Sequence, residues 1–266
     1  MRGRVLIVAG SDSGGGAGIQ ADIKTVTMLD AYAATAITAL TAQNTEGVFG
    51  VFPVPPDFVR QQVEVVLDDI GADAIKTGML HDIGVIEALA AVLRERAGTI
   101  PLVVDPVMAA KGGARLIDPD AVDALKRLLI VRAAVLTPNL PEAEILCGAA
   151  ISDRAGMEAA GEALLRLGCG AVLVKGGHLP GDTVIDVLST AAGSRIWESP
   201  RIASHHTHGT GCTLASAIAA GLAQGLGVEP AVDRARAYVQ RAIASAPGLG
   251  RGHGPLDHAH PLRADR

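Results

Sequence analysis

The sequence predicts an α/β fold in which helices cover both faces of a mostly parallel central sheet. Short apolar runs typical of buried strands alternate with longer segments of helical spacing from residue 5 to residue 246. Polar and glycine-rich segments follow most of these strands, at the edge where an open parallel sheet binds its ligands. No change in composition marks a boundary, so we expect residues 1–266 to form a single domain.

The first strand–loop–helix unit is the clearest part of this pattern. Residues 5–9 form an apolar run closed by Gly10, as in a buried parallel strand. A glycine-rich loop then leads into helical spacing over residues 19–29. The second strand is expected at residues 34–40, ending near residues 43–44. The other strands of the first half are expected at residues 48–54, 74–77, 101–104 and 133–136, and its other helices at residues 55–70 and 83–96.

The second half repeats the alternation and adds an antiparallel element. Residues 184–188 and 195–199 are expected to pair as antiparallel strands. The tail from Gly248 is rich in Gly, His and Pro, so we expect it to be irregular. The remaining elements are a strand at residues 171–174 and helices at residues 157–167, 213–224 and 230–246.

Composition limits the possible partners. Hydrophobic residues make up 49% of the chain but aromatic residues only 2%, so platforms for stacking nucleic-acid bases are nearly absent. The net charge of −5, with no basic run, also argues against nucleic acid or a membrane surface as a partner. No apolar run reaches the roughly 18 residues that span a bilayer, and the apolar start at residues 1–10 is too short for a signal peptide.

The cysteines indicate the compartment. Cys147, Cys169 and Cys212 are odd in number and form no CxxC pair. Such cysteines are typical of reduced thiols. We therefore expect a cytoplasmic protein.

Segment 205–213 is the strongest candidate for a ligand site. Gly209 and Gly211 flank Thr210 in the turn that enters a predicted buried helix, and Cys212 lies in the first turn of that helix. A helix start has unpaired N–H groups and partial positive charge, so it binds anions such as phosphate. The same field should make the Cys212 thiol more acidic than that of a free cysteine. An anion site beside a reactive thiol indicates phosphoryl chemistry; the alternative is a tight turn without a ligand.

Polar residues at other strand ends complete the candidate site. Asp105 and Glu142 follow two successive core strands and could share one Mg²⁺ through water molecules, or could cap helices instead. Lys175 follows an apolar strand, where a lysine more often meets an anion than solvent. The polar segments at the strand ends begin at Gly10, Gln43, Gly78, Asp105, Asn139 and Lys175.

Three other kinds of site are weaker interpretations. Residues 16–21 fit a relaxed dinucleotide-binding pattern, but residues 31–45 lack the acidic residue that would hold the ribose. A Walker P-loop needs Gly-Lys-Ser/Thr, and no lysine occurs before Lys24. A zinc site would be formed by His205, His206, His208 and Cys212. We favour a solvated loop there, because the neighbouring glycines suit an oxyanion better.

Eight segments that together span nearly the whole chain carry a family resemblance. They are residues 9–25, 37–45, 76–80, 105–108, 137–143, 174–178, 206–213 (HTHGTGCT) and 252–258. In this order they resemble the hydroxymethylpyrimidine/phosphomethylpyrimidine kinases of thiamine synthesis. Jointly the segments are very specific, and Asp257, where asparagine is expected, is a minor departure.

The resemblance implies a ribokinase-like three-layer sandwich. It also implies that ATP phosphorylates a pyrimidine alcohol and then its monophosphate. We expect ATP and Mg²⁺ as cofactors, a small-molecule pyrimidine as substrate, and a homodimer as the assembly. The expected metal ligands are Asp105 and Glu142.

The resemblance also implies roles for individual residues. The residues expected to bind the substrate are Gln43 at the pyrimidine edge, Asp22 and Gly10 nearby, and Met79 and Val107 as apolar walls. The residues expected to bind ATP are Lys175, Asn139, Thr210 and Gly211. The expected catalytic residues are Gly209, Thr210 and Gly211 as the anion hole, Lys175 at the phosphates and Cys212 as the base.

Two alternatives remain at this point. Pyridoxal kinases of the same superfamily share the cysteine at position 212, so a pyridoxal or pyridoxine kinase is the second candidate. A non-enzymatic binding module for phosphorylated metabolites would have the anion site without turnover. If the chain is the pyrimidine kinase, its two reactions should depend unequally on Cys212, because a monophosphate acceptor, with a second pKa of about 6, is already ionised.

Overall fold

Nine strands form one mixed sheet within residues 1–109 and 119–263, which the computed structural model describes. The strands are β1 (Arg4–Asp12), β2 (Tyr32–Gln43), β3 (Val48–Pro53), β4 (Ala74–Thr77), β5 (Leu102–Val104), β6 (Val135–Leu136), β7 (Ala171–Lys175), β8 (Thr183–Thr190) and β9 (Gly193–Pro200). Their order across the sheet is β3-β2-β1-β4-β5-β6-β7-β8-β9. The central pairs from β2 to β7 are parallel, whereas β3 pairs antiparallel with β2, β8 with β7, and β9 with β8.

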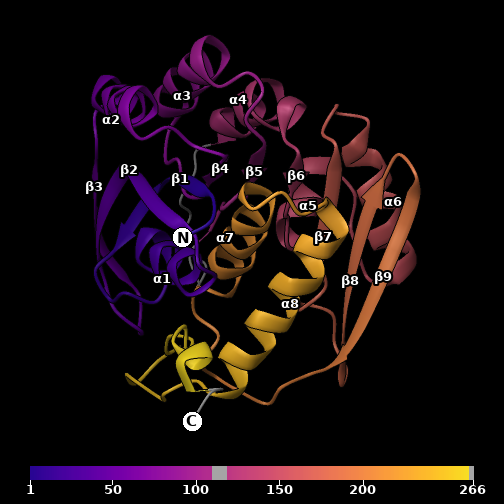
Figure 1. Cartoon of the computed structure of the whole chain (residues 1–266). Coiled ribbons are helices and arrows are strands. Elements are labelled where there is room, and N and C mark those ends of the chain that lie inside the picture. The colour runs from indigo at the N-terminus through magenta and orange to yellow at the C-terminus, as the bar shows by residue number, and fades with distance from the viewer. Residues whose placement is uncertain (110–118, 264–266) are drawn as a thin grey trace.

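Helices cover both faces of this sheet (Figure 1). They are α1 (Gly18–Met28), α2 (Pro56–Asp69), α3 (Ile83–Arg96), α4 (Pro119–Leu128), α5 (Leu140–Cys147), α6 (Arg154–Leu165), α7 (Thr210–Ala223) and α8 (Val228–Ala244), with short 3-10 turns at η1 (Ile130–Arg132) and η2 (His260–Arg263). One apolar layer joins the sheet to α1, α7 and α8, and the other joins it to α2–α6. None of the described helices is both long and apolar enough to cross a bilayer.

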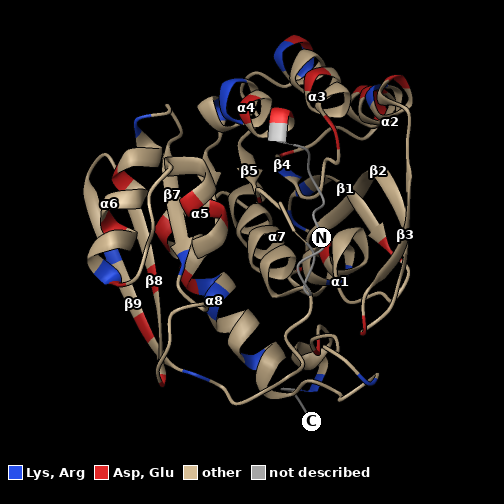
Figure 2. Ribbon diagram, turned by 180° about the vertical axis from the view of Figure 1, so that it is seen from behind, with Lys and Arg blue, Asp and Glu red and all other residues tan. Residues whose placement is uncertain are grey.

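β1 shows why the sequences of the central strands are continuous apolar runs. Leu6 and Val8 belong to the layer under α2–α6, whereas Val5, Ile7 and Ala9 belong to the layer under α1, α7 and α8. Successive side chains of a strand point to opposite faces, so a strand covered on both faces must be apolar at every position. Charged residues of both signs are instead spread over the outer helices (Figure 2).

The predicted α/β fold is confirmed, but three details of the prediction were wrong. No helix was predicted at α4 or α5. The helix after the central glycines was predicted to begin at residue 213, whereas α7 begins at Thr210, so that Gly211 is itself helical. The second strand begins at Tyr32 and not at residue 34, although it ends at Gln43 as expected.

Candidate active site

A cavity of about 940 Å³ lies where the carboxyl ends of the parallel strands meet the start of α7. Most of the residues expected at the site contribute to its lining: Gly10, Gln43, Met79, Asp105, Val107, Asn139, Glu142, Lys175, Gly209, Thr210, Gly211 and Cys212. The chain passes from β1 to β2 on one side and to β4 on the other, and ligands bind at such a switch point of an open sheet. The topology thus collects residues that are far apart in the sequence.

The start of α7 is shaped by two glycines. Gly209 precedes the helix with φ of 82°, a left-handed conformation that favours glycine, and a Cβ there would collide with the carbonyl oxygen of Gly16. At Gly211 a Cβ would lie 3.2 Å from Nζ of Lys175. No side chain caps the helix start, so the first N–H groups of α7 have no side-chain acceptor. This arrangement suits a bound phosphate.

Lys175 and Asp105 form an ion pair at the centre of the cavity. Nζ of Lys175 lies 3.0 Å from Oδ1 of Asp105, and the Thr137 hydroxyl donates to the same oxygen at 3.2 Å. Burial disfavours the charged amine, but Asp105 and Glu142 outweigh burial and raise the pKa of Lys175 above its ordinary value. The amine therefore stays a cation that can meet an incoming phosphate.

Glu142 lines the cavity and also caps the start of α5. Its carboxylate accepts a hydrogen bond from the Asn139 backbone N–H at 2.8 Å, while the Asn139 side chain accepts one from the Glu142 N–H. This reciprocal pair is a capping box that starts α5. Burial raises the pKa of Glu142 to about 7; the Lys175 cation opposes the shift and the Asp105 carboxylate adds to it.

The two carboxylates fit a magnesium ion better than a fully protein-bound metal. Among the described residues no group of three or more His, Cys, Asp or Glu side chains could hold a metal. Asp105 and Glu142 both line the cavity, and the Asp105 carboxylate disfavours the charged form of Glu142, as a neighbouring like charge does. Mg²⁺ is commonly bound by one or two carboxylates that leave its other positions to water and substrate phosphates.

Cys212 corrects the expectation of an acidic thiol. Burial raises the pKa of Cys212 to about 12; Lys76 opposes this shift, whereas Asp22 and Asp105 add to it. The positive charge of the helix start was expected to lower the thiol pKa. Burial of the thiol and two nearby carboxylates disfavour the thiolate more strongly. In the ligand-free protein the thiol is therefore neutral at pH 7.

Asp22 does not lie where the resemblance suggested. It is absent from the cavity lining and fully buried between α1, β4 and α7. Both of its oxygens lie 2.9 Å from Nζ of Lys76, which is also fully buried, and the Ser216 hydroxyl donates to one of them at 2.7 Å. Burial disfavours the Lys76 cation, but Asp22 raises the pKa of Lys76 above its ordinary value. Asp22 thus holds a buried cation near Cys212.

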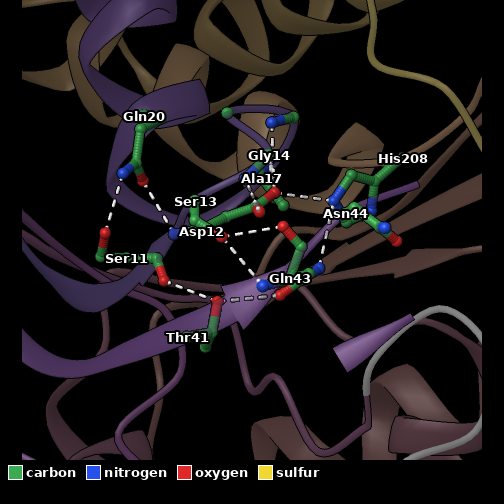
Figure 3. Close-up of polar contacts among 12 residues, drawn as sticks. Ser11, Asp12, Ser13, Gly14, Ala17, Gln20, Thr41, Gln43, Asn44 and His208 are labelled. Carbon is green, nitrogen blue, oxygen red and sulfur yellow. Dashed lines mark hydrogen bonds and ion pairs between the residues drawn. The ribbon is translucent and has the colours of Figure 1, made fainter. Parts of the chain in front are cut away.

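A second network joins the N-terminal loop to the segment before α7 (Figure 3). The Asp12 carboxylate accepts hydrogen bonds from the backbone N–H groups of Gly14, Gly16 and Ala17, and lies 2.8 Å from Nε2 of His208. Burial opposes ionisation of Asp12, but the hydrogen bonds from His208 and the backbone outweigh it and lower the pKa of Asp12.

The sequence pattern assigned no role to Lys76 or Asp12, and it indicated His208 only as part of segment 205–213 and of a disfavoured zinc site. One signal was available for Lys76, because a lysine inside a short apolar strand has to find a buried partner. No signal in the sequence pairs His208 with Asp12, which lies 196 positions away.

Phosphoryl transfer needs positive charge and fixed positions around the transferred group more than it needs covalent help. The α7 start and Lys175 supply that charge at one point of the cavity. With the sheet order described above, the site defines a phosphotransferase of the ribokinase-like class.

The chain belongs to the phosphomethylpyrimidine kinase family, whose family model matches residues 12–257. A hydroxymethylpyrimidine/phosphomethylpyrimidine kinase of Bacillus subtilis is 46% identical over 256 residues, which cover 96% of this chain and 94% of the relative. The thiamine biosynthesis bifunctional protein ThiED of Geobacter sulfurreducens is 55% identical over 257 residues. That match covers 97% of this chain but 52% of the relative, so the chain spans about half of the bifunctional protein.

A solved structure confirms the fold. The pyridoxal kinase of Bacillus subtilis, determined as an ADP complex, superposes with a TM-score of 0.91 at 36% identity and covers 99% of both chains. This identity is lower than the identity to the pyrimidine kinases above. The predictions of a ribokinase-like fold, of the family and of an ATP-using kinase are therefore confirmed.

Proposed function

We propose that this chain transfers the γ-phosphoryl group of ATP to 4-amino-5-hydroxymethyl-2-methylpyrimidine and then to its monophosphate, which yields the diphosphate used in thiamine biosynthesis. The observation that carries the proposal is that Gln43, Lys175 and Cys212 line one cavity together with the glycine turn before α7. An amide can donate and accept at once, which suits an aminopyrimidine edge. The family match over residues 12–257 supports the same substrate class.

The proposed roles divide the cavity into two ends. Gln43, Gly10 and Met79 come from β2, β1 and the end of β4 and would surround the pyrimidine. The nucleotide would occupy the end near β7 and α8, where Val239 and Ile243 contribute apolar surface. Val107 would add a further apolar wall to the substrate end, and Asn139 would contact the nucleotide.

The phosphates would lie between these two ends. Lys175 and the N–H groups of Thr210 and Gly211 would neutralise charge on the transferred group. We propose that Asp105 and Glu142 bind Mg²⁺, which would neutralise phosphate charge and orient the phosphates.

Cys212 is proposed as the base for the alcohol. Only the thiolate can accept the alcohol proton, so the neutral thiol would first lose its own proton to solvent, and the buried Lys76 cation favours that loss. In a loose transition state the bond from the alcohol oxygen to phosphorus forms late. The base would therefore take the alcohol proton late in the step. The monophosphate acceptor requires no such step.

We also infer that residues 1–266 form one domain around the single sheet, and that the protein works in the cytoplasm as a homodimer. The three cysteines are free, which supports a reducing compartment. The β3 edge supports the dimer, because it exposes Phe49, Val51 and Phe52, and the described part of the chain has no strand beyond β3.

A pyridoxal kinase remains the second candidate, because the fold superposes closely on one. The deciding experiment measures ATP consumption with the pyrimidine alcohol, its monophosphate and pyridoxal side by side. We expect both pyrimidines to be turned over faster than pyridoxal. Lys175→Ala should lower kcat by about 10²–10³, as the loss of a preorganised charge does, whereas the control Lys126→Ala on α4 should leave it unchanged. Faster turnover of pyridoxal would replace the pyrimidine assignment.

A further inference from the structure

The two ends of the Gln43 amide meet partners that do not suit them. Nε2 of Gln43 lies 3.3 Å from Nε2 of His208, and Oε1 of Gln43 lies 3.2 Å from Oγ1 of Thr41 (Figure 3). Which end of an amide carries the nitrogen is decided by its hydrogen-bond partners. The neighbours of Gln43 decide the question here from both sides.

The His208 nitrogen that faces Gln43 carries a hydrogen. Asp12 is held as a carboxylate by three backbone N–H groups, so it can only accept hydrogen bonds. Nε2 of His208 lies 2.8 Å from that carboxylate and therefore carries a hydrogen, whether the ring is neutral or protonated. An amide N–H pointing at the same nitrogen would place two hydrogens against each other. The end of Gln43 that faces His208 must consequently be its oxygen.

Thr41 leads to the same orientation independently. Its hydroxyl has one proton, and the backbone carbonyl of Ser11, 2.9 Å away, can only accept it. The Thr41 oxygen then has lone pairs left and needs a donor, which the Gln43 nitrogen provides if the amide is rotated by a half-turn. In that orientation Asp12 and the Gln43 oxygen share the single Nε2 hydrogen of His208, and the Gln43 N–H donates to the Thr41 oxygen.

We propose that His208, anchored by Asp12, is a positioning residue that fixes the Gln43 amide with its oxygen toward His208 and its nitrogen toward Thr41, and so selects the ring edge of the substrate. Gln43, Thr41 and His208 all line the cavity. The oxygen keeps a lone pair and the nitrogen keeps one N–H for a ligand. A substrate must then offer an exocyclic amine on the His208 side and an unprotonated ring nitrogen on the Thr41 side.

This inference rests on the proposed contact between Gln43 and the pyrimidine. It adds that the contact has a fixed polarity, which a glutamine free to rotate would lack. The informative probe is the 4-oxo analogue of the hydroxymethylpyrimidine, in which oxygen replaces the amine and the ring nitrogen carries a hydrogen. Its donor and acceptor are exchanged, so a fixed amide rejects it because polar groups stay unpaired.

The experiment compares kcat/KM for the amino substrate and the oxo analogue in four variants and the wild type. His208→Leu and Thr41→Val each free the amide, so the ratio of the two kcat/KM values should fall about tenfold or more. His208→Gln can still donate to Asp12 and to Gln43, so it should keep most of the ratio. Gln43→Ala should lose the ratio entirely. A change in stability alone would lower both kcat/KM values together and leave their ratio unchanged.

The outcomes separate the inference from the function on which it rests. A lost ratio in Gln43→Ala, His208→Leu and Thr41→Val, with recovery in His208→Gln, supports the fixed amide. If Gln43→Ala loses the ratio but His208→Leu and Thr41→Val both keep it, Gln43 binds the ring and His208 does not orient it. An unchanged ratio in Gln43→Ala would overturn the contact itself. Should His208→Leu not fold, Thr41→Val decides alone.

Discussion

At the scale of single residues, the two proposed reactions should differ in how strongly their rates depend on Cys212. If the Cys212 thiolate is the base that takes the proton of the alcohol, Cys212→Ala should slow phosphorylation of the alcohol by about 10²–10⁴-fold. The loss with the monophosphate should be much smaller, because that acceptor is already an anion. Cys212→Asp should restore part of the first reaction. Both rates are measured at saturating Mg-ATP.

The control for this comparison is Cys147→Ala, because Cys147 is a half-buried cysteine at the end of α5. It should leave both rates unchanged. Equal losses in the two reactions of Cys212→Ala would show that the side chain shapes the anion site and moves no proton.

The high pKa of Cys212 predicts slow alkylation despite its place in the cavity lining. The thiolate is the reactive form, and a pKa of about 12 leaves very little of it at pH 8. After allowance for the greater nucleophilicity of a more basic thiolate, iodoacetamide should react about 10–100-fold more slowly than with a model thiol. The rate is measured from pH 7 to 10 in a variant without Cys147 and Cys169. It should still be rising at pH 10, and a plateau below pH 9 would contradict the burial argument.

At the scale of elements, the sequence predicted strands and helices wherever local pattern alone decides them. The apolar run of β1 and the Pro55–Pro56 start of α2 are examples. α5 was missed although Asn139 and Glu142 have capping-box spacing, because helix capping by Glu142 was only the alternative to its interpretation as a metal ligand. α7 begins early because the left-handed Gly209 ends the preceding turn, which spacing does not reveal.

The sequence predicted those residues of the site that lie at the carboxyl ends of strands. Gln43, Asp105 and Lys175 were found because parallel strands bring their carboxyl ends to one edge. The Lys76–Asp22 pair joins residues 54 positions apart, and only the packing of α1 against β4 and α7 creates it. The thiol pKa depends on burial and neighbouring carboxylates, which no local pattern contains.

The contact between the C-terminal tail and α7 predicts a pH dependence of stability. His258 is buried, and its Nε2 lies 3.0 Å from the hydroxyl of Thr213 in α7. Burial lowers the pKa of His258 to about 4, and the charges of Lys24 and His260 act in the same direction. The unfolded chain has an ordinary value of about 6.5, so between pH 6.5 and 4 it binds more protons than the folded protein.

Stability should therefore fall as the pH falls through this window. By linkage the contribution of His258 to the free energy of unfolding should drop by about 2 kcal/mol between pH 7.5 and 5.0. The glutamine of His258→Gln cannot titrate. The free energy of unfolding of this variant, measured in urea, should therefore fall by about 2 kcal/mol less than that of the wild type between the two pH values. His253→Gln changes an exposed histidine of the same tail and should behave like the wild type. Identical losses in His258→Gln and the wild type would show that His258 is not held neutral.

At the scale of the whole molecule, the two edges of the sheet are protected differently. The outer strand β9 is polar, and its Arg195 lies over the Trp197 ring at 4.6 Å and pairs with Glu229 and Asp233. Charged side chains of this kind discourage pairing with another strand. β3, at the other edge, contains no charged residue.

The β3 edge gathers the phenylalanines of the chain. Phe49 and Phe52 on β3 are 72% and 67% exposed, and Phe58 on α2 is 54% exposed. These are all three phenylalanines of the sequence, and none is used in the core. An uncharged edge strand beside exposed aromatic residues is the kind of surface that a second copy of the chain would bury.

The wild type should consequently be a dimer, and charge placed on this edge should separate it. We expect light scattering after gel filtration to give twice the chain mass at micromolar concentration. Phe49→Glu combined with Phe52→Glu should shift the protein to monomer, because two buried carboxylates per subunit would oppose association. Val131→Glu, at an exposed apolar residue of η1, should remain a dimer. A monomeric wild type would contradict the proposed assembly, and a dimeric double variant would place the interface on another surface.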